Sequence, residues 1–327
     1  MRAAIFWTSV VLFAVLFFFR QWWDDISRDR LATTASRVED GTERIQALVR
    51  TMPPKASQAQ LAQMVGGAYR GVARVLPRKR QPGLTREDLA GLIRVLLNSM
   101  ARLAMIYDDQ PLTAEGPAVY SANVMLFVPR PSVGPFPVDV VAALRFHPPE
   151  YDLARLLGAL VLRPELSATS ADVADLPGPD LDVPAIALPV PTEPLRDGRW
   201  NCLPGAPKAF LTEQVDGYDD AGTLAEWCER KGNFPPSVVS ELRDYFATGD
   251  GRGVRSFISR PLLTLDQRKL GVLNLHSSRT NVLGDADERM PAFLGMLTPL
   301  FLELQSALEI LDEFEPGVRA PLAPRGH

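Results

Sequence analysis

The sequence has few of the residues that carry metal or nucleophilic chemistry. Its 327 residues include only two cysteines, Cys202 and Cys228, and only three histidines, His147, His276 and His327. No cysteine pair or cysteine and histidine cluster has zinc-site spacing, so we expect no metal site. Two cysteines without a disulfide framework also fit a reducing compartment.

Signatures of common enzyme classes are absent from the sequence as well. It contains no Walker A, Gly-x-Ser-x-Gly, His-Glu-x-x-His or protein-kinase pattern. We therefore expect a protein that is not an enzyme and uses no cofactor. The alternative is a thiol-dependent reductase acting through Cys202 or Cys228, which would require a lowered thiol pKa, whereas buried inert thiols are the simpler interpretation.

Positive charge is scarce in the body of the chain. Residues 1–110 carry a net charge of +6 and residues 111–315 one of −12. Because nucleic-acid binding depends on clustered cations, we expect no nucleic-acid partner. Hydrophobic residues make up 46% and charged residues 23% of the chain, as in ordinary globular proteins, so most of the chain should fold.

One long run near the N-terminus has no charge at all. Residues 3–19 read AAIFWTSVVLFAVLFFF between Arg2 and Arg20, and two tryptophans follow. This run is near the lower length limit for a helix that crosses a bilayer, and indole rings prefer the headgroup layer. We expect residues 1–23 to be a transmembrane anchor. A cleaved signal peptide is the alternative, but no small-residue cleavage site follows the run.

Positive residues on either side of this run predict its orientation. Arg2 precedes it, whereas four arginines follow within the next 18 residues: Arg20, Arg28, Arg30 and Arg37. Cations near a span stay on the cytoplasmic side. We expect a single-pass protein of the inner (plasma) membrane with its body in the cytoplasm.

Residues 24–82 predict a membrane-proximal helical stalk. A thin apolar stripe along residues 24–52 is typical either of such a stalk or of a parallel homodimer seam. A second helix starts at Ser57 and ends before Pro77. Cations gather at its end and either contact anionic lipid or are solvated: Arg70, Arg74, Arg78, Lys79 and Arg80.

Residues 83–314 predict the folded domain, and residues 315–327 a loose tail. Thr85 to Asp88 form a capping-box-like helix start, and apolar residues recur with helical period over 89–106. Because seventeen of the 29 prolines lie between Pro111 and Pro207, we expect strands and loops there. Hydrophobic patterning predicts strands over 119–128, 138–146, 159–163, 185–190, 254–263 and 270–276, and helices over 223–230, 237–247 and 290–311.

Two segments resemble a known family. The sequence VRSFISRPLLTLDQRKLGVLNLHSSR, residues 254–279, resembles the end of a GAF domain, and residues 205–210, GAPKAF, look like that family's Gly-x-x-x-Ala-Phe helix start. The resemblance implies an α+β fold with a central antiparallel sheet, helices packed on one face and a small-molecule pocket on the other. The resemblance to GAF domains also implies that this domain acts as a sensor.

Ligand signatures within that family match this sequence only in part, which leaves a cyclic nucleotide open without indicating one. Asp287 and Glu288 stand where cyclic-nucleotide-binding members carry an acidic pair, but an Asn-Lys pair is not evident and Val282 and Leu283 occupy the Phe neighbourhood. Bilin-binding members attach their pigment through a Cys commonly followed by His, and neither cysteine here has that neighbour. The glycine-rich residues 249–253 fit a flexible turn better than a phosphate loop.

The last two predicted strands suggest a ligand site. Alternation places Asn274 and His276 on one sheet face, together with either Arg255 or Arg260, depending on a register that the sequence does not reveal. Phe210 and Trp227 are candidate stacking surfaces. A solvent-facing sheet surface is the alternative interpretation.

We therefore expect a membrane-anchored cytoplasmic GAF-like sensor or regulator. It would bind a small ligand or a downstream partner protein and transmit a conformational signal through its stalk, with a homodimer as one option. A scaffold without a ligand, whose pocket is filled by its own side chains, is the alternative, and an empty, roomy cavity would count against it.

Overall fold

A computed structural model describes Gly66 and residues 85–108, 118–148, 152–171, 183–192, 202–232, 234–264, 266–283 and 289–314. The predicted anchor (residues 1–23) and tail (residues 315–327) lie outside the described residues, as does the predicted stalk (residues 24–82) apart from Gly66. These three domain assignments stay predictions.

The described elements alternate between helices and strands. In chain order they are α3 (Arg86–Asp108), β1 (Tyr120–Pro129), α4 (Val138–Ala143), η2 (Leu153–Arg155), β2 (Leu156–Thr169), β3 (Ile186–Pro191), α5 (Ala206–Thr212), β4 (Asp216–Tyr218), η3 (Ala221–Thr223), α6 (Leu224–Arg230), α7 (Pro236–Ala247), β5 (Ser256–Leu263), β6 (Lys269–Ser277) and α8 (Arg289–Phe314). This order confirms an α+β chain.

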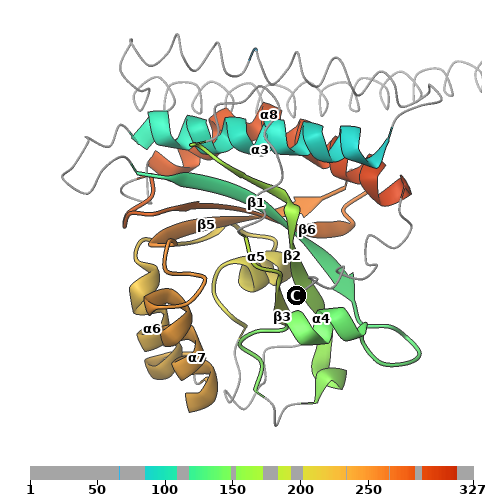
Figure 1. Ribbon diagram of the computed structural model, residues 1–327, viewed down its shortest axis with the longest axis vertical. Coiled ribbons are helices and arrows are strands. Elements are labelled where there is room, and N and C mark those ends of the chain that lie inside the picture. The colour runs from blue at the N-terminus through green and yellow to red at the C-terminus, as the bar shows by residue number, and fades with distance from the viewer. Residues whose placement is uncertain are drawn as a thin grey trace, which may run out of the picture. The chain divides into compact units, whose positions relative to one another are not determined.

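A six-stranded antiparallel sheet forms the centre of the fold, in the order β3-β2-β1-β6-β5-β4 (Figure 1). The central strands β1 and β6 come from opposite ends of the domain sequence. They approach closely at Gly271, where a Cβ atom would overlap the carbonyl oxygen of Met125. Glycine at this position therefore allows the two halves of the sheet to join.

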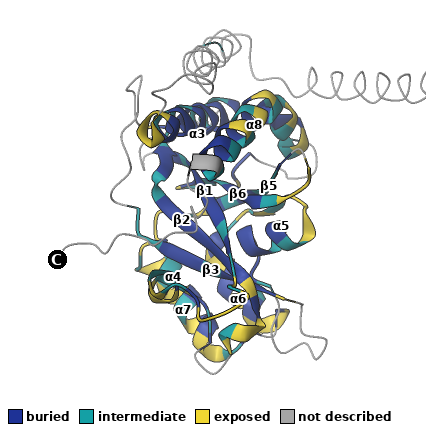
Figure 2. Ribbon diagram, turned by 90° about the vertical axis from the view of Figure 1, so that its right-hand side faces the viewer, coloured by how far each residue is buried: buried dark blue, intermediate teal, exposed yellow. Residues whose placement is uncertain are grey.

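Helices α3 and α8 cover one face of the sheet (Figures 1 and 2). α3 begins with the predicted capping box, because the Asp88 amide donates to Thr85 Oγ1 at 3.1 Å and the Thr85 amide donates to Asp88 Oδ2 at 3.0 Å. Its five leucines and Ile93 are buried, at 0–2% exposure, in the core that the helix shares with the sheet. These helices are the domain's structural core.

Both helices are also long and apolar enough to cross a membrane by length and composition. In α3, however, 78% of the most apolar window is buried inside the fold, against 44% in α8. Burial of this extent is what a core helix packed on a sheet requires, so the apolar character of α3 is explained by its packing.

The other face of the sheet carries the short helices α4, α5, α6 and α7 (Figure 1). The GAF resemblance implied helices packed on one face, whereas the structure has short helices on the other face as well. The strand predicted over 138–146 is wrong: residues Val138–Ala143 form helix α4. Pro137 precedes its first turn and Val140 alone is buried, so the valines do not alternate between two sheet faces.

The other elements predicted within the described residues agree with the structure apart from their ends. The strand predicted over 159–163 extends to both sides as β2, and the predicted terminal helix is α8 with Pro299 inside it. The three-residue edge strand β4 was not predicted. Helix α5 begins after Gly205, which has φ +83° and belongs to the GAPKAF segment.

Candidate functional site

A cavity of about 200 Å³ lies on the sheet face opposite α3 and α8. Strands β1, β5 and β6 form its floor, and residues from α5, α6 and α7 line its sides. Most of its lining side chains are apolar or aromatic, among them Met125, Leu203, Leu242 and Phe257. A concave, mainly apolar space with a few polar groups is the usual form of a small-molecule site.

The strand register brings the polar floor of the cavity together. Ser259 of β5 lies opposite Asn274 of β6, which lies opposite Asn123 of β1. Phe257 in turn lies opposite His276. The sequence-predicted pair Asn274 and His276 therefore shares one face, and both line the cavity.

Three of these side chains form a hydrogen-bonded row. Ser259 Oγ donates to Asn274 Oδ1 at 2.8 Å, and Asn274 Nδ2 donates to Asn123 Oδ1 at 3.0 Å. Asn123 is 8% exposed and Ser259 is 1% exposed, so the row lies under the cavity rather than on an outer surface. Within the described part of the chain, the Nδ2 group of Asn123 has no partner and can donate to a ligand.

His276 is the titratable group of the cavity floor. Burial lowers its pKa to about 4, so its imidazole is neutral at physiological pH. Among the described residues no hydrogen bond to its ring is present. A neutral imidazole has one donor and one acceptor nitrogen, so His276 can pair with either kind of ligand group.

Aromatic side chains of α7 form one wall. The rings of Phe146 and Tyr245 meet edge to face at 5.3 Å between centroids, and those of Tyr245 and Phe246 at 5.1 Å. Burial and the nearby Asp250 carboxylate raise the pKa of Tyr245 to about 12, which keeps its hydroxyl protonated. These rings offer both faces and edges to a flat ligand.

The register also separates the two candidate arginines. Arg260 lies on the sheet face that α3 and α8 cover, which we call the helix-covered face. There its guanidinium donates to the Leu294 carbonyl at 3.3 Å and lies 3.8 Å from the centre of the Phe301 ring. Its burial lowers its pKa. A ligand in the cavity would be separated from Arg260 by the sheet.

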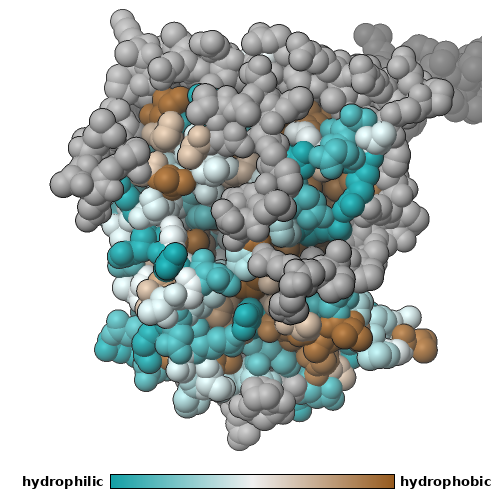
Figure 3. Space-filling model, viewed as in Figure 1, coloured by the Kyte–Doolittle hydropathy of each residue, from teal (hydrophilic) through white to brown (hydrophobic). Residues whose placement is uncertain are grey.

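Arg255 lies just before β5, beside a separate hollow of about 300 Å³ that is also lined by Arg243 and Arg252. Its guanidinium is 3.9 Å from Asp220 Oδ1. The hollow and the cavity share Leu242, Phe246 and Val254 as lining residues, and the outer surface of α6 and α7 is largely hydrophilic (Figure 3). Among the described residues, no lysine or arginine lines the cavity itself.

The two predicted stacking residues, Phe210 and Trp227, lie outside the cavity lining. The ring of Phe210 packs at 4.4 Å from that of Phe127, with the Lys269 amine 5.3 Å from its centre. The ring of Trp227 meets Tyr218 edge to face at 6.4 Å. Of the six predicted site residues, the structure thus brings Asn274 and His276 together at the cavity and places the other four elsewhere.

Several residues of the cavity were not recognised in the sequence. Asn123 interrupts the apolar run of β1, and this isolated polar residue was the available signal for it. Ser259 lies within the predicted strand over 254–263, but no local pattern indicates its place in a site. Tyr245 and Phe246 reach the cavity from α7, and no local pattern indicates this long-range contact.

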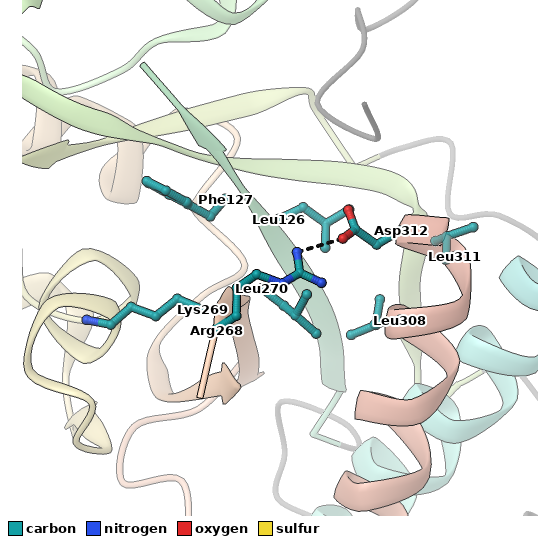
Figure 4. Close-up of a pocket in the computed structure, with 8 residues that line it drawn as sticks. All are labelled: Leu126, Phe127, Arg268, Lys269, Leu270, Leu308, Leu311 and Asp312. Carbon is teal, nitrogen blue, oxygen red and sulfur yellow. Dashed lines mark hydrogen bonds and ion pairs between the residues drawn. The ribbon is translucent and has the colours of Figure 1, made fainter. Parts of the chain in front are cut away.

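A third concave space is too small to be a ligand site. It has a volume of about 20 Å³ and lies where the β5–β6 hairpin meets the end of α8 (Figure 4). Arg268 of the hairpin and Asp312 of α8 close it with an ion pair of 2.7 Å between Nη1 and Oδ2 (Figure 4). A space of this size holds about one water molecule.

The cysteines do not have the environment of reactive thiols. Burial raises the pKa of Cys228 to about 12, and burial together with the Asp216 carboxylate raises the pKa of Cys202. Reactive cysteines need the opposite shift. In the described part of the chain, no three His, Cys, Asp or Glu side chains form a metal-binding group.

Comparisons with known proteins find matches only among solved structures. No family model and no curated protein matches this chain. The GAF domain of an Acinetobacter phosphoenolpyruvate-protein phosphotransferase is 12% identical over 76% of this chain and 97% of its own length, with a TM-score of 0.33. The phycocyanobilin-bound GAF domain of a cyanobacterial phytochrome is 14% identical over 76% of this chain and 97% of its own, with a TM-score of 0.31.

A third match is the chromophore-binding domain of a bacteriophytochrome from R. palustris, 14% identical over 76% of this chain and 63% of that one, with a TM-score of 0.29. Identities this low say nothing about the ligand of this chain. The antiparallel sheet, the terminal helices on one face and the cavity on the other are the features that the GAF resemblance implied, and the fold is GAF-like.

Proposed function

We propose that this chain is a membrane-anchored cytoplasmic sensor or regulator whose GAF-like domain binds a small molecule. The observation that supports the proposal is the cavity of about 200 Å³ with Asn274, His276 and Asn123 on its floor. Apolar cavities of about 150 Å³ take up benzene, so this one has room for a small ligand with polar groups.

Contacts across the sheet connect the cavity with the long helices α3 and α8, so that ligand binding could act on them. Asn123 and Asn274 face the cavity from the central strands β1 and β6, while their neighbours Val124 and Leu273 belong to the core shared with α3 and α8. A ligand that repositions the central strands therefore acts on both helices through close packing.

Asp108 strengthens this route because it connects three segments. Its side chain, 1% exposed, accepts hydrogen bonds from the Tyr120 hydroxyl at the start of β1 and from the Leu283 amide ahead of α8. Arg289, the first residue of α8, lies 3.9 Å from its other oxygen. Through α3, which follows residues 24–82 in the chain, the signal would reach the predicted stalk and anchor.

Two alternatives from the sequence have less support. A scaffold whose pocket is filled by its own side chains does not account for a cavity of this volume. A thiol-dependent reductase would need a lowered cysteine pKa, and both cysteines have raised values. The absence of catalytic turnover remains part of the proposal.

Native mass spectrometry of the gently purified full chain tests the proposed function. We expect a non-covalently bound small molecule on the wild-type protein and its loss in the Ala206→Leu variant, whose larger side chain would enter the cavity. Wild-type protein that carries no ligand and gains no thermal stability from any compound of a small-molecule panel would contradict the proposal.

A further inference from the structure

We infer that the ligand of the cavity is an uncharged molecule with a flat aromatic body and one polar edge that both accepts and donates hydrogen bonds. The inference rests on the proposed function, since it names the ligand class of the same cavity. Three properties of the site lead to it: the shape of the walls, the unused hydrogen-bonding groups and the distribution of charge.

The walls favour a flat ring. Phe146, Tyr245 and Phe246 form successive edge-to-face contacts at 5.1–5.3 Å, and Phe257 adds a fourth ring from the sheet. Aromatic rings pack most favourably in offset or edge-to-face arrangements, and a flat ligand extends such a cluster. The volume of about 200 Å³ has room for one ring system with a short substituent.

The floor favours a polar edge with two functions. Asn123 Nδ2 lacks a partner within the described residues and needs an acceptor. His276 is neutral and offers one donor and one acceptor nitrogen. A primary amide meets both requirements, because its carbonyl oxygen accepts from Asn123 while its amino group donates to the imidazole. A ligand that covers Asn123 Nδ2 without accepting its hydrogen bond would leave a buried donor unpaired, which is costly. The site therefore selects ligands that have an acceptor at this position.

The charge distribution disfavours ionised ligands. Of the described residues that line the cavity, the one carboxylate is Asp250, which is exposed and repels an anion. Arg255 borders the neighbouring hollow and Arg260 lies behind the sheet. A carboxylate or phosphate in the cavity would therefore lose its hydration without gaining a cation from the described lining residues. An organic cation could contact the aromatic rings and the Asp250 carboxylate. Cationic ligands are therefore the competing class, and the experiment must distinguish them from neutral ones.

Three probes of nearly identical shape separate the classes: benzamide is neutral, benzoate is an anion and benzamidine is a cation at neutral pH. Isothermal titration of the full chain in detergent should show saturable binding of benzamide at millimolar concentration, with benzoate and benzamidine each at least about tenfold weaker. Tighter binding of benzoate or of benzamidine overturns the ligand class while leaving a small-molecule sensor in place.

Variants connect the binding to named residues. Asn123→Leu should weaken benzamide about tenfold, the effect of one lost hydrogen bond, while toluene, which has no polar edge, should bind as it does to the wild type. The matched control Arg255→Gln should leave benzamide binding unchanged. Equal losses for toluene and benzamide in Asn123→Leu would overturn the assignment of the polar edge.

The results also separate a wrong ligand class from a wrong proposed function. If none of the three probes binds but native mass spectrometry finds a bound molecule, the ligand class is wrong and the proposed function stands. If none binds and no bound molecule is found, the proposed function itself fails.

Discussion

The two faces of one sheet are packed differently in this protein. On the first, α3 and α8, with 23 and 26 residues, bury a continuous apolar core. On the second, helices of six to twelve residues are joined by loops and leave a cavity of about 200 Å³. Figure 2 shows α3 and α8 above the sheet and α4, α6 and α7, with many exposed residues, below it. Long helices fill space continuously, whereas short ones leave room for a ligand.

The largest expected effect is a loss of packing on the helix-covered face. Phe293 of α8 is fully buried and contacts Tyr107 at 5.2 Å between ring centroids. We expect Phe293→Ala to lower the free energy of unfolding by about 3–5 kcal/mol, since it leaves a void in a closed core. Phe257→Ala, which widens a space already present, should cost less. Urea denaturation of both variants measures the difference, and equal losses would remove the contrast between the faces.

The pH dependence of stability tests the burial of His276. Its pKa is about 4 in the folded protein against about 6.5 when unfolded, so below pH 6.5 the unfolded chain binds the proton more readily. The associated stability is complete above pH 6.5 and is lost as the pH falls toward 4. We expect the wild type to lose about 2–3 kcal/mol more than His276→Gln between pH 7 and pH 4 in urea denaturation. Parallel losses in the two proteins would show that His276 is not desolvated.

A pair of identical substitutions compares free space on the two faces. Ala307 of α8 is fully buried in the closed core, and Ala206 of α5 lines the cavity. Ala307→Leu should lower the free energy of unfolding by about 1–3 kcal/mol through overpacking. Ala206→Leu should change it by less than about 0.5 kcal/mol and abolish benzamide binding. A large destabilisation by Ala206→Leu would mean that the cavity has no room for a ligand.

The smallest effect is expected at Arg260, on the face away from the cavity. Its guanidinium contacts the Phe301 ring and the Leu294 carbonyl. Arg260→Gln should cost about 1 kcal/mol in thermal or urea denaturation, through the lost cation–π contact and hydrogen bond. Benzamide affinity should be unchanged. A loss of binding without a loss of stability would show that Arg260 reaches the ligand.

Elements with strong periodicity could be predicted from the sequence, and short ones could not. The apolar period after Thr85 gave α3, and alternation around Asn274 gave the face of β6, because both patterns depend on neighbours in the chain. In contrast, the valines of α4 fit the pattern of a strand in the sequence. In the structure they lie in a helix, and Val140 alone is buried. Intrinsic preference is weak over six residues, so tertiary packing decides.

The candidate site divides in the same way. Asn274 and His276 were recognised because one strand places them together. The choice between Arg255 and Arg260 required the register between β5 and β6. The role of Asn123 required the pairing of β1 with β6, and the hydrogen-bonded residues Asn123 and Asn274 are 151 positions apart in the sequence. Such long-range pairings are not encoded in any local pattern.

The most direct measurement is the position of a heavy-atom ligand. Crystals of the protein soaked with 4-bromobenzamide should show an anomalous bromine peak in the cavity bounded by Asn274, Tyr245 and Phe257, with the amide at Asn123 and His276. Crystals of Ala206→Leu should lack the peak. A peak in the arginine-lined hollow, a peak on the helix-covered face, or a wild-type cavity that stays empty would contradict the assignment of the second sheet face as a binding site.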